Sequence, residues 1–337
     1  MRGLKILSLL LGAGLLFWIL GNVDLTEVGE LILRVGITGL GLIIFVYFLA
    51  FLCDSISWLL ILTALPVSLA WIRRTFFVRM AGEAFNNVVP AGGFAGEPVK
   101  AVILKARYGI SYTDASASIV MARTVNMIAL IAFLIVGFLF MSVSEAIDSN
   151  LKLTASIGLV LLSTGTVLLF AIQRYRVSSW LMARFAGARW ADKAAGAFAV
   201  IEDMDDQFIT FYTRHRARLL ASLLLALINW VLGVVEIYLT FLLLGHEISW
   251  QDAWMIEALA QMVRSAVFFI PLGIGAQEGA FVLISSAITG TPSLGLACAA
   301  IRRIRELSWI VLGLLAWMAY PTSQKEIQSV RTPPDGN

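Results

Sequence analysis

Long apolar stretches alternate with short polar segments along nearly the whole chain. A helix that crosses a bilayer needs about 20 mostly apolar residues. Six stretches approach or exceed that length: 4–21, 37–65, 113–141, 153–172, 219–245 and 294–320. Two further apolar stretches, 80–104 and 255–289, are interrupted by proline and glycine. The pattern predicts an all-α integral membrane protein with about six transmembrane helices and two broken, re-entrant hairpins.

The two interrupted stretches share a motif. In each, proline is followed by glycine two residues later and by glutamate seven residues later: Pro90, Gly92 and Glu97, then Pro271, Gly273 and Glu278. Broken helices leave backbone N–H and C=O groups unpaired, which is tolerated at membrane depth only inside protein or beside a watery cavity. Matching interruptions in two halves of a membrane protein point to the binding site of a transporter.

The order of these segments predicts an inverted repeat within one membrane domain, residues 1–321. The half-repeats 1–150 and 151–321 both read helix, helix, hairpin, helix, but they start from opposite sides of the membrane. Three landmarks recur at an offset near 181 residues, namely Pro90 with Pro271, Glu97 with Glu278 and, one position out of register, Asp54 with Glu236. The offset fails at the first helix of each half because the segment 173–218 is longer than its counterpart.

Composition and charge support a membrane protein with both termini in the cytoplasm. The chain is 59% hydrophobic and 14% charged, and its mean hydropathy is +0.87. With the N terminus inside, 18 of the 25 basic residues fall in cytoplasmic segments and only Arg34 and Lys152 fall outside, as the positive-inside rule requires. Cys53 and Cys298 lie in apolar stretches, so neither a disulfide nor a thiolate metal site is expected.

Two other segments are expected in the cytoplasm. The loop 173–218 has apolar residues at helical spacing, which predicts an amphipathic helix lying on the membrane face or packing under the bundle. Its acidic residues, Glu202, Asp203, Asp205 and Asp206, are interpreted as a solvated face rather than a metal site. The tail 322–337 is expected to be disordered.

Five arginines lie inside apolar stretches: Arg123, Arg264, Arg302, Arg303 and Arg305. A central arginine costs about 2.5–3.5 kcal/mol on insertion scales, so each needs a carboxylate, a carbonyl or a watery cavity. Buried ion pairs that fix helix packing are one explanation. Three arginines within four residues point over most of the circumference of one helix, so one bundle partner could hardly neutralise them all. An anionic substrate would supply the missing charge.

The hairpin turns add a second anion-binding device. After Gly92 and Gly93, and after Gly273 and Gly275, a half-helix is expected to begin near mid-membrane with free N–H groups facing a cavity. Glutamates follow these turns, Glu97 and Glu278, and either cap the N–H groups or compete with the substrate for the arginines. Lys100 is a further candidate for the headgroup, and the intramembrane acids and the two prolines (Asp54, Glu236, Pro90, Pro271) are candidates for gating or coupling.

At these residues the chain resembles the flippase-like membrane family named for the transmembrane part of lysylphosphatidylglycerol synthase. The resemblance covers about 5–320 and rests on GEAFNNVVPAGGFAGEPVKAVIL with Arg123 downstream, and on FFIPLGIGAQEGAF with Arg302 and Arg303 downstream. It implies movement of a polar or charged lipid between leaflets of a bacterial cytoplasmic (inner) membrane, the lipid being a phospholipid, hopanoid or glycolipid. We expect a stand-alone member of the family, without the aminoacyl-transferase domain of the synthase. A homo-oligomer or an association with a lipid-biosynthetic enzyme is possible under this resemblance.

Three functions are weighed. A lipid flippase without ATP hydrolysis leads, since no GxxxxGK loop is present. A soluble-anion exchanger would use the same broken helices without a lateral opening. A membrane-embedded lipid-modifying enzyme would depend on carboxylates, because the two histidines, His215 and His246, lie in loops. We therefore expect no enzyme activity, catalytic residue, metal, cofactor or nucleic-acid partner.

Overall fold

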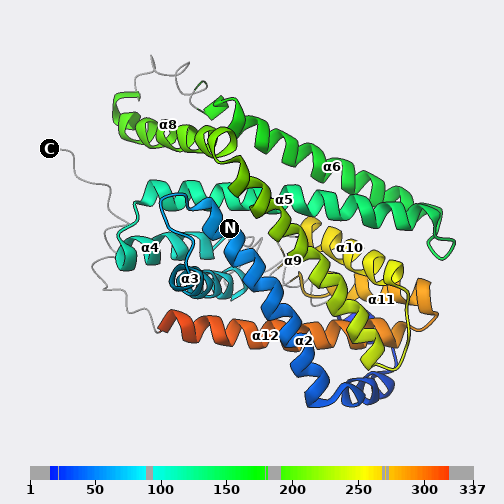
Figure 1. Ribbon diagram of the computed structural model, residues 1–337. Coiled ribbons are helices and arrows are strands. Elements are labelled where there is room, and N and C mark those ends of the chain that lie inside the picture. The colour runs from blue at the N-terminus through cyan, green and yellow to red at the C-terminus, as the bar shows by residue number, and fades with distance from the viewer. Residues whose placement is uncertain are drawn as a thin grey trace.

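The computed structural model (Figure 1) consists of α-helices joined by short connections, and no strand occurs in the residues that it describes. These residues are 16–21, 23–88, 94–178, 180, 191–267, 270 and 273–318. The helices are α2 (Leu25–Ile61), α3 (Leu69–Val88), α4 (Gly96–Tyr108), α5 (Tyr112–Val143), α6 (Ser149–Arg174), α8 (Ala191–Arg214), α9 (Arg216–Leu243), α10 (Trp250–Ala266), α11 (Ala276–Thr289) and α12 (Pro292–Met318). The predicted all-α membrane fold is confirmed.

Four helices, α2, α5, α6 and α9, are long and apolar enough to cross a membrane. Helix α12 has 27 residues, but its cluster of charged residues keeps it out of that group. Of the predicted stretch 4–21, residues 4–15 lie outside the described residues, and residues 16–20 are helical. Helix α2 begins at Leu25, where the Asp24 carboxylate accepts the N–H of Thr26 at 2.9 Å and so caps the helix. It is broken at Gly36 (φ +60°, ψ −178°), and its second part begins at the predicted residue 37.

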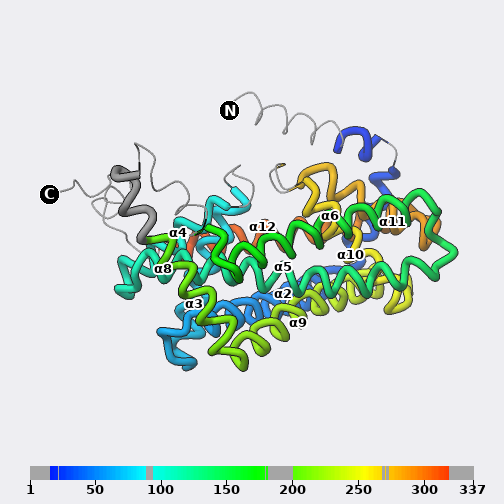
Figure 2. The backbone as a smooth tube through the Cα atoms, turned by 90° about the horizontal axis from the view of Figure 1, so that it is seen from above, coloured from blue at the N-terminus to red at the C-terminus, as the bar shows by residue number. Residues whose placement is uncertain are grey.

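Each interrupted stretch folds into a pair of shorter helices, α3 with α4 and α10 with α11. Three long helices, α5, α6 and α9, run between the two pairs, so the pairs enter the bundle from opposite ends. Figures 1 and 2 show α3 and α4 at one end of the bundle and α10 and α11 at the other. The second turn uses Gly273 and Gly275 at φ +60° and +81°, a region that only glycine enters readily. Pro90, Gly92, Gly93 and Pro271 lie outside the described residues.

Equivalent helices of the two halves have equivalent packing partners. Helix α2 packs on its counterpart α9, while α3 packs on α12 and α10 packs on α5. A Cβ on Gly313 of α12 would lie 2.5 Å from the Met80 carbonyl oxygen of α3, and one on Gly137 of α5 would lie 2.5 Å from the Ala258 Cβ of α10. Small residues thus allow both crossings to be close. This is the pairing that an inverted repeat requires, and the half-repeat boundaries stay a prediction.

Helix α8 belongs to the predicted loop 173–218 and packs against α5, α6 and α9. Its residues Phe208, Phe211 and Tyr212 are buried. The Tyr212 hydroxyl donates to Gln173 Oε1 at 2.6 Å, and Gln173 donates to Thr124 Oγ1 at 2.7 Å. For this part of the loop, a helix packed under the bundle is the better interpretation. Residues 181–190 and 319–337, which include the predicted tail, lie outside the described residues.

Candidate functional site

A cavity of about 350 Å³ lies between the two hairpins and is lined by helices of both halves. The last residues of α3 and the turn before α11 reach it through Asn87, Ile270 and Gly273. Its charged lining comprises six cations and five acids: Arg79, Lys100, Arg123, Arg264, Arg302 and Arg305, with Asp54, Glu83, Glu236, Glu257 and Glu306. The candidate site is therefore a polar chamber inside an otherwise apolar bundle.

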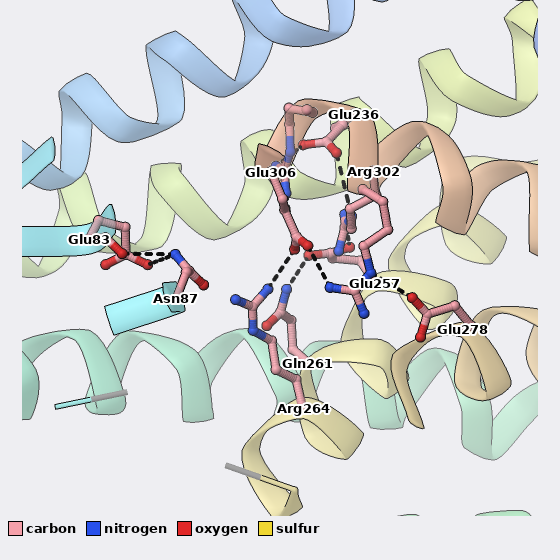
Figure 3. Close-up of polar contacts among 11 residues, drawn as sticks. Glu83, Asn87, Glu236, Glu257, Gln261, Arg264, Glu278, Arg302 and Glu306 are labelled. Atoms are coloured by element: carbon pink, nitrogen blue, oxygen red, sulfur yellow. Dashed lines mark hydrogen bonds and ion pairs between the residues drawn. The ribbon is translucent and has the colours of Figure 1, made fainter. Parts of the chain in front are cut away.

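The most buried part of the lining is an ion-pair cluster between α9, α10 and α12 (Figure 3). Arg302 donates to Glu257 Oε2 at 2.6 Å and lies 3.4 Å from Glu236 Oε1. Arg305 donates to the other Glu236 oxygen at 2.7 Å and stacks 3.8 Å from the centre of the Tyr47 ring. Since Arg302 and Arg305 are only 3% and 6% exposed, these cations are held by the protein itself.

Glu306 extends the cluster toward the cavity. It accepts hydrogen bonds from Arg264 at 3.0 Å and from Arg303 at 2.8 Å. Arg303 also donates to Glu278 Oε1 at 2.5 Å. Four arginines of the second half thus meet four glutamates, one each from α9, α10, α11 and α12. No single partner neutralises Arg302, Arg303 and Arg305, but the expectation that a substrate must supply the missing charge is wrong. Glutamates of four helices supply it, and the local sequence does not reveal these pairings.

The first half has a looser arrangement. Glu97 forms an ion pair with Lys100 at 2.5 Å and another with Arg123 of α5. Asp54 of α2 forms an ion pair with Arg79 of α3. Glu83, shown with Asn87 on one side of Figure 3, accepts hydrogen bonds from amides, including Asn87 at 3.2 Å. Glu97 therefore pairs with two cations, whereas the hydrogen bonds to Glu83 come from side-chain amides.

The starts of the half-helices are capped by the protein. Glu278 accepts the Gly275 N–H at 2.8 Å, so this glutamate both caps α11 and binds Arg303. In the first hairpin the cap comes from Asn86, whose Oδ1 accepts the Gly96 N–H at 2.7 Å. Sequence reasoning missed Asn86, although the Asn-Asn pair before Pro90 was visible. The sequence also led us to expect free N–H groups at the starts of the half-helices. The N–H groups of Gly275 and Gly96 already have acceptors.

Exposure separates the candidate cations into two classes. The side chains of Arg123 and Arg264 are 44% and 35% exposed, whereas Lys100 is 8% exposed. Both arginines line the cavity, one from each half of the chain. Each shares its carboxylate with a second cation. The remaining predicted residues, Arg303, Glu97, Glu278 and Gly275, do not line the cavity, but they contact residues that do or adjoin them in the hairpin.

Long apolar helices around a charged chamber, with two broken hairpins meeting at it, define a multi-pass α-helical membrane protein. A family model for the lysylphosphatidylglycerol synthase TM region matches residues 5–315, so this chain belongs to that family, and the resemblance inferred from its motifs is confirmed. A UPF0104 membrane protein of Pyrococcus horikoshii is 24% identical over 287 residues, 81% of this chain and 84% of the relative. A second, from Methanothermobacter thermautotrophicus, is 23% identical over 266 residues, 75% and 77% of the two chains. No solved structure matches.

These comparisons identify the family and show that this is a membrane protein. The names of the two relatives state that they are membrane proteins and give no activity. The bacterial cytoplasmic membrane and the cytoplasmic position of both termini therefore stay predictions from charge and resemblance.

Proposed function

We propose that this protein is a lipid transporter that moves a lipid with an anionic headgroup between leaflets without ATP hydrolysis. One observation carries the proposal: two partly exposed arginines, Arg123 and Arg264, line a single cavity between hairpins that enter from opposite ends. Membership of the family supports a lipid-related role.

The ion pairs around the cavity favour an anion as the ligand. Arg302 and Arg305 are buried with Glu236 and Glu257 and form a fixed scaffold. Arg123 shares Glu97 with Lys100, and Arg264 shares Glu306 with Arg303. A phosphate entering the cavity can take over one arginine and leave the glutamate with its second cation. Arginine suits this exchange because its planar guanidinium donates two parallel hydrogen bonds to a phosphate.

The size of the cavity favours a headgroup rather than a whole lipid. Its volume of about 350 Å³ lies near the lower end of the 300–1,000 Å³ typical of ligand pockets. A headgroup fits such a volume, and the acyl chains would remain among the membrane lipids. Alternating access would follow from rocking of one half against the other around the fixed site, with Glu97 and Glu278 changing partners.

The lining chemistry supports transport over catalysis. No serine, cysteine or histidine lies among the described residues that line the cavity. A lipid-modifying enzyme would have to work with carboxylates, arginines, Lys100 and Tyr47. A soluble-anion exchanger would share the arginines, and experiment can separate it from a lipid transporter.

The test is leaflet-specific translocation of labelled phosphatidylglycerol in proteoliposomes. We expect Arg123→Gln and Arg264→Gln each to reduce the rate roughly tenfold or more, since hydrogen bonds to charged groups contribute about 1.5–3 kcal/mol. Arg214→Gln, at the exposed end of α8, is the matched control and should keep the wild-type rate.

Two outcomes would contradict the proposal. Equal rates in wild-type, Arg264→Gln and protein-free vesicles would mean that the protein does not move this lipid class. Uptake of radiolabelled phosphate or sulfate that depends on Arg123 and Arg264, without lipid movement, would assign the cavity to a soluble anion.

A further inference from the structure

A second cavity, of about 740 Å³, lies at the end of the bundle where α3 begins and α4 and α12 end. Three arginines line it, Arg73, Arg74 and Arg107, together with three aromatic residues, Trp71, Phe77 and Tyr108. The two cavities have no lining residue in common. By the distribution of basic residues, this end faces the cytoplasm.

We call this second cavity the rim cavity. Two of its arginines, Arg73 and Arg74, differ from those of the central cavity in their partners. Arg74 stacks on two rings, 4.7 Å from the Trp71 centroid and 5.6 Å from that of Tyr108. A stacked guanidinium uses its face and leaves its N–H edge available for an acceptor. Within the described part of the chain, neither Arg73 nor Arg74 forms an ion pair with a carboxylate. The lining of the rim cavity thus contains arginines and no carboxylate, whereas the central cavity has five acids for its six cations.

The second hairpin carries no cation at the positions that correspond to these arginines. At the repeat offset of 181 residues, Arg73, Arg74 and Arg107 correspond to Trp254, Met255 and Ile288. The same architectural position at the opposite end of the bundle therefore carries no cation. Arginines at these hairpin positions therefore occur at one end of the bundle only.

We propose that the rim cavity binds the phosphate of an anionic phospholipid in the leaflet at that end. The arginines would hold the phosphate. Phe77, a wall of the cavity, has 41% of its surface exposed and offers an apolar contact to the lipid beside the headgroup. Trp71 and Tyr108 are residues that favour the headgroup level, and basic pockets between helices on the cytoplasmic side suit anionic headgroups. The proposal does not depend on transport through the central cavity.

The test is native mass spectrometry of the full-length protein in detergent, titrated with phosphatidylglycerol and, separately, with phosphatidylcholine. We expect Arg73→Gln/Arg107→Gln to weaken the tightest phosphatidylglycerol binding roughly tenfold, with little effect on phosphatidylcholine. Lys105→Gln is the matched control, because Lys105 is exposed on α4 at the same end and does not line the cavity. It should leave phosphatidylglycerol binding unchanged.

A conservative variant keeps the test interpretable if the double variant folds poorly. Arg73→Lys/Arg107→Lys retains the charge, and its binding should fall between those of the wild type and the glutamine variant. Equal phosphatidylglycerol binding in wild type and glutamine variant, or an equal loss in Lys105→Gln, would overturn the proposal. Displacement of the lipid by millimolar inorganic phosphate would assign the site to a soluble anion and overturn the proposal that its ligand is a lipid. If Arg264→Gln abolished translocation but still bound phosphatidylglycerol at the rim cavity, the rim cavity would be a site independent of the central cavity.

Discussion

The two halves of this protein share a packing scheme but differ in how they hold charge. In the second half, Arg302 and Arg305 are buried against Glu236 and Glu257, and every arginine on α12 has a carboxylate partner. In the first half, the Asp54–Arg79 pair is 16–17% exposed, and Arg123 is 44% exposed, against 35% for Arg264 of the second half. We infer that the second half is rigid and that the first half is responsive, meaning that its ion pairs can change partners. The repeat gives both halves the same packing, and the difference in ion pairing favours movement of the first half.

The largest expected effect tests the rigid half. Replacing Arg302 by Gln leaves Glu257 and Glu236 buried with one fewer cation, and breaking a buried pair in this way costs about 3–5 kcal/mol. We expect a large loss of thermal stability in detergent, measured by fluorescence-detected size exclusion after heating. Arg302→Gln/Glu257→Gln should recover much of the loss, because it removes the unpaired carboxylate.

The matched variant in the first half is Arg79→Gln. Its pair with Asp54 is more exposed, so we expect a clearly smaller loss of stability. Equal losses for Arg79→Gln and Arg302→Gln would contradict the distinction between a rigid and a responsive half.

A smaller effect compares the two hairpins. A Cβ on Gly96 would lie 1.8 Å from the Gly82 carbonyl oxygen, whereas one on Gly279 would approach only Ile19 Cδ1 at 3.4 Å. Gly96→Ala must push α3 and α4 apart, and overpacking typically costs about 1–3 kcal/mol. Gly279→Ala should be close to neutral in the same heating assay. Equal stability of the two variants would mean that the first hairpin tolerates a wider spacing than its structure has.

Much of the fold could be predicted from sequence because helices in lipid must satisfy their own hydrogen bonds. Apolar length therefore located α5, α6, α9 and α12 to within a few residues. The second part of α2 begins at the predicted residue 37, after the break at Gly36. The short helical segment before Gly36 was missed, because its first turn is acidic and capped by Asp24.

The candidate site was only partly predictable. Apolar context identified the arginines and the nearby acids, but not their pairing, which depends on how helices rotate against one another. Glu306 shows this: it follows Arg305 in sequence, yet its hydrogen bonds go to Arg264 and Arg303. The Asn86 cap was missed for a related reason, because a side chain at the end of one helix caps the start of the next.

The smallest expected effect separates the two glutamates that follow the hairpin turns. Glu97 neutralises Lys100 and Arg123, so Glu97→Gln releases two cations near the cavity. We expect phosphatidylglycerol to bind that variant more tightly, by roughly tenfold if about 1.4 kcal/mol of competition is removed, with slower translocation. Glu278 holds Arg303 and caps Gly275, and Arg303 keeps Glu306 when Glu278 is lost.

Glu278→Gln should therefore preserve lipid affinity or raise it only slightly. It should slow turnover, because both the cap on Gly275 and the ion pair with Arg303 are weakened. Binding titrations alongside proteoliposome rates would measure both quantities. If Glu278→Gln tightened binding more than Glu97→Gln, the competing carboxylate would lie in the second half, and the assignment of the responsive side would have to be reversed. The comparison is direct because the two residues occupy equivalent positions of the repeated motif, so any difference between them reflects their partners rather than their place in the chain.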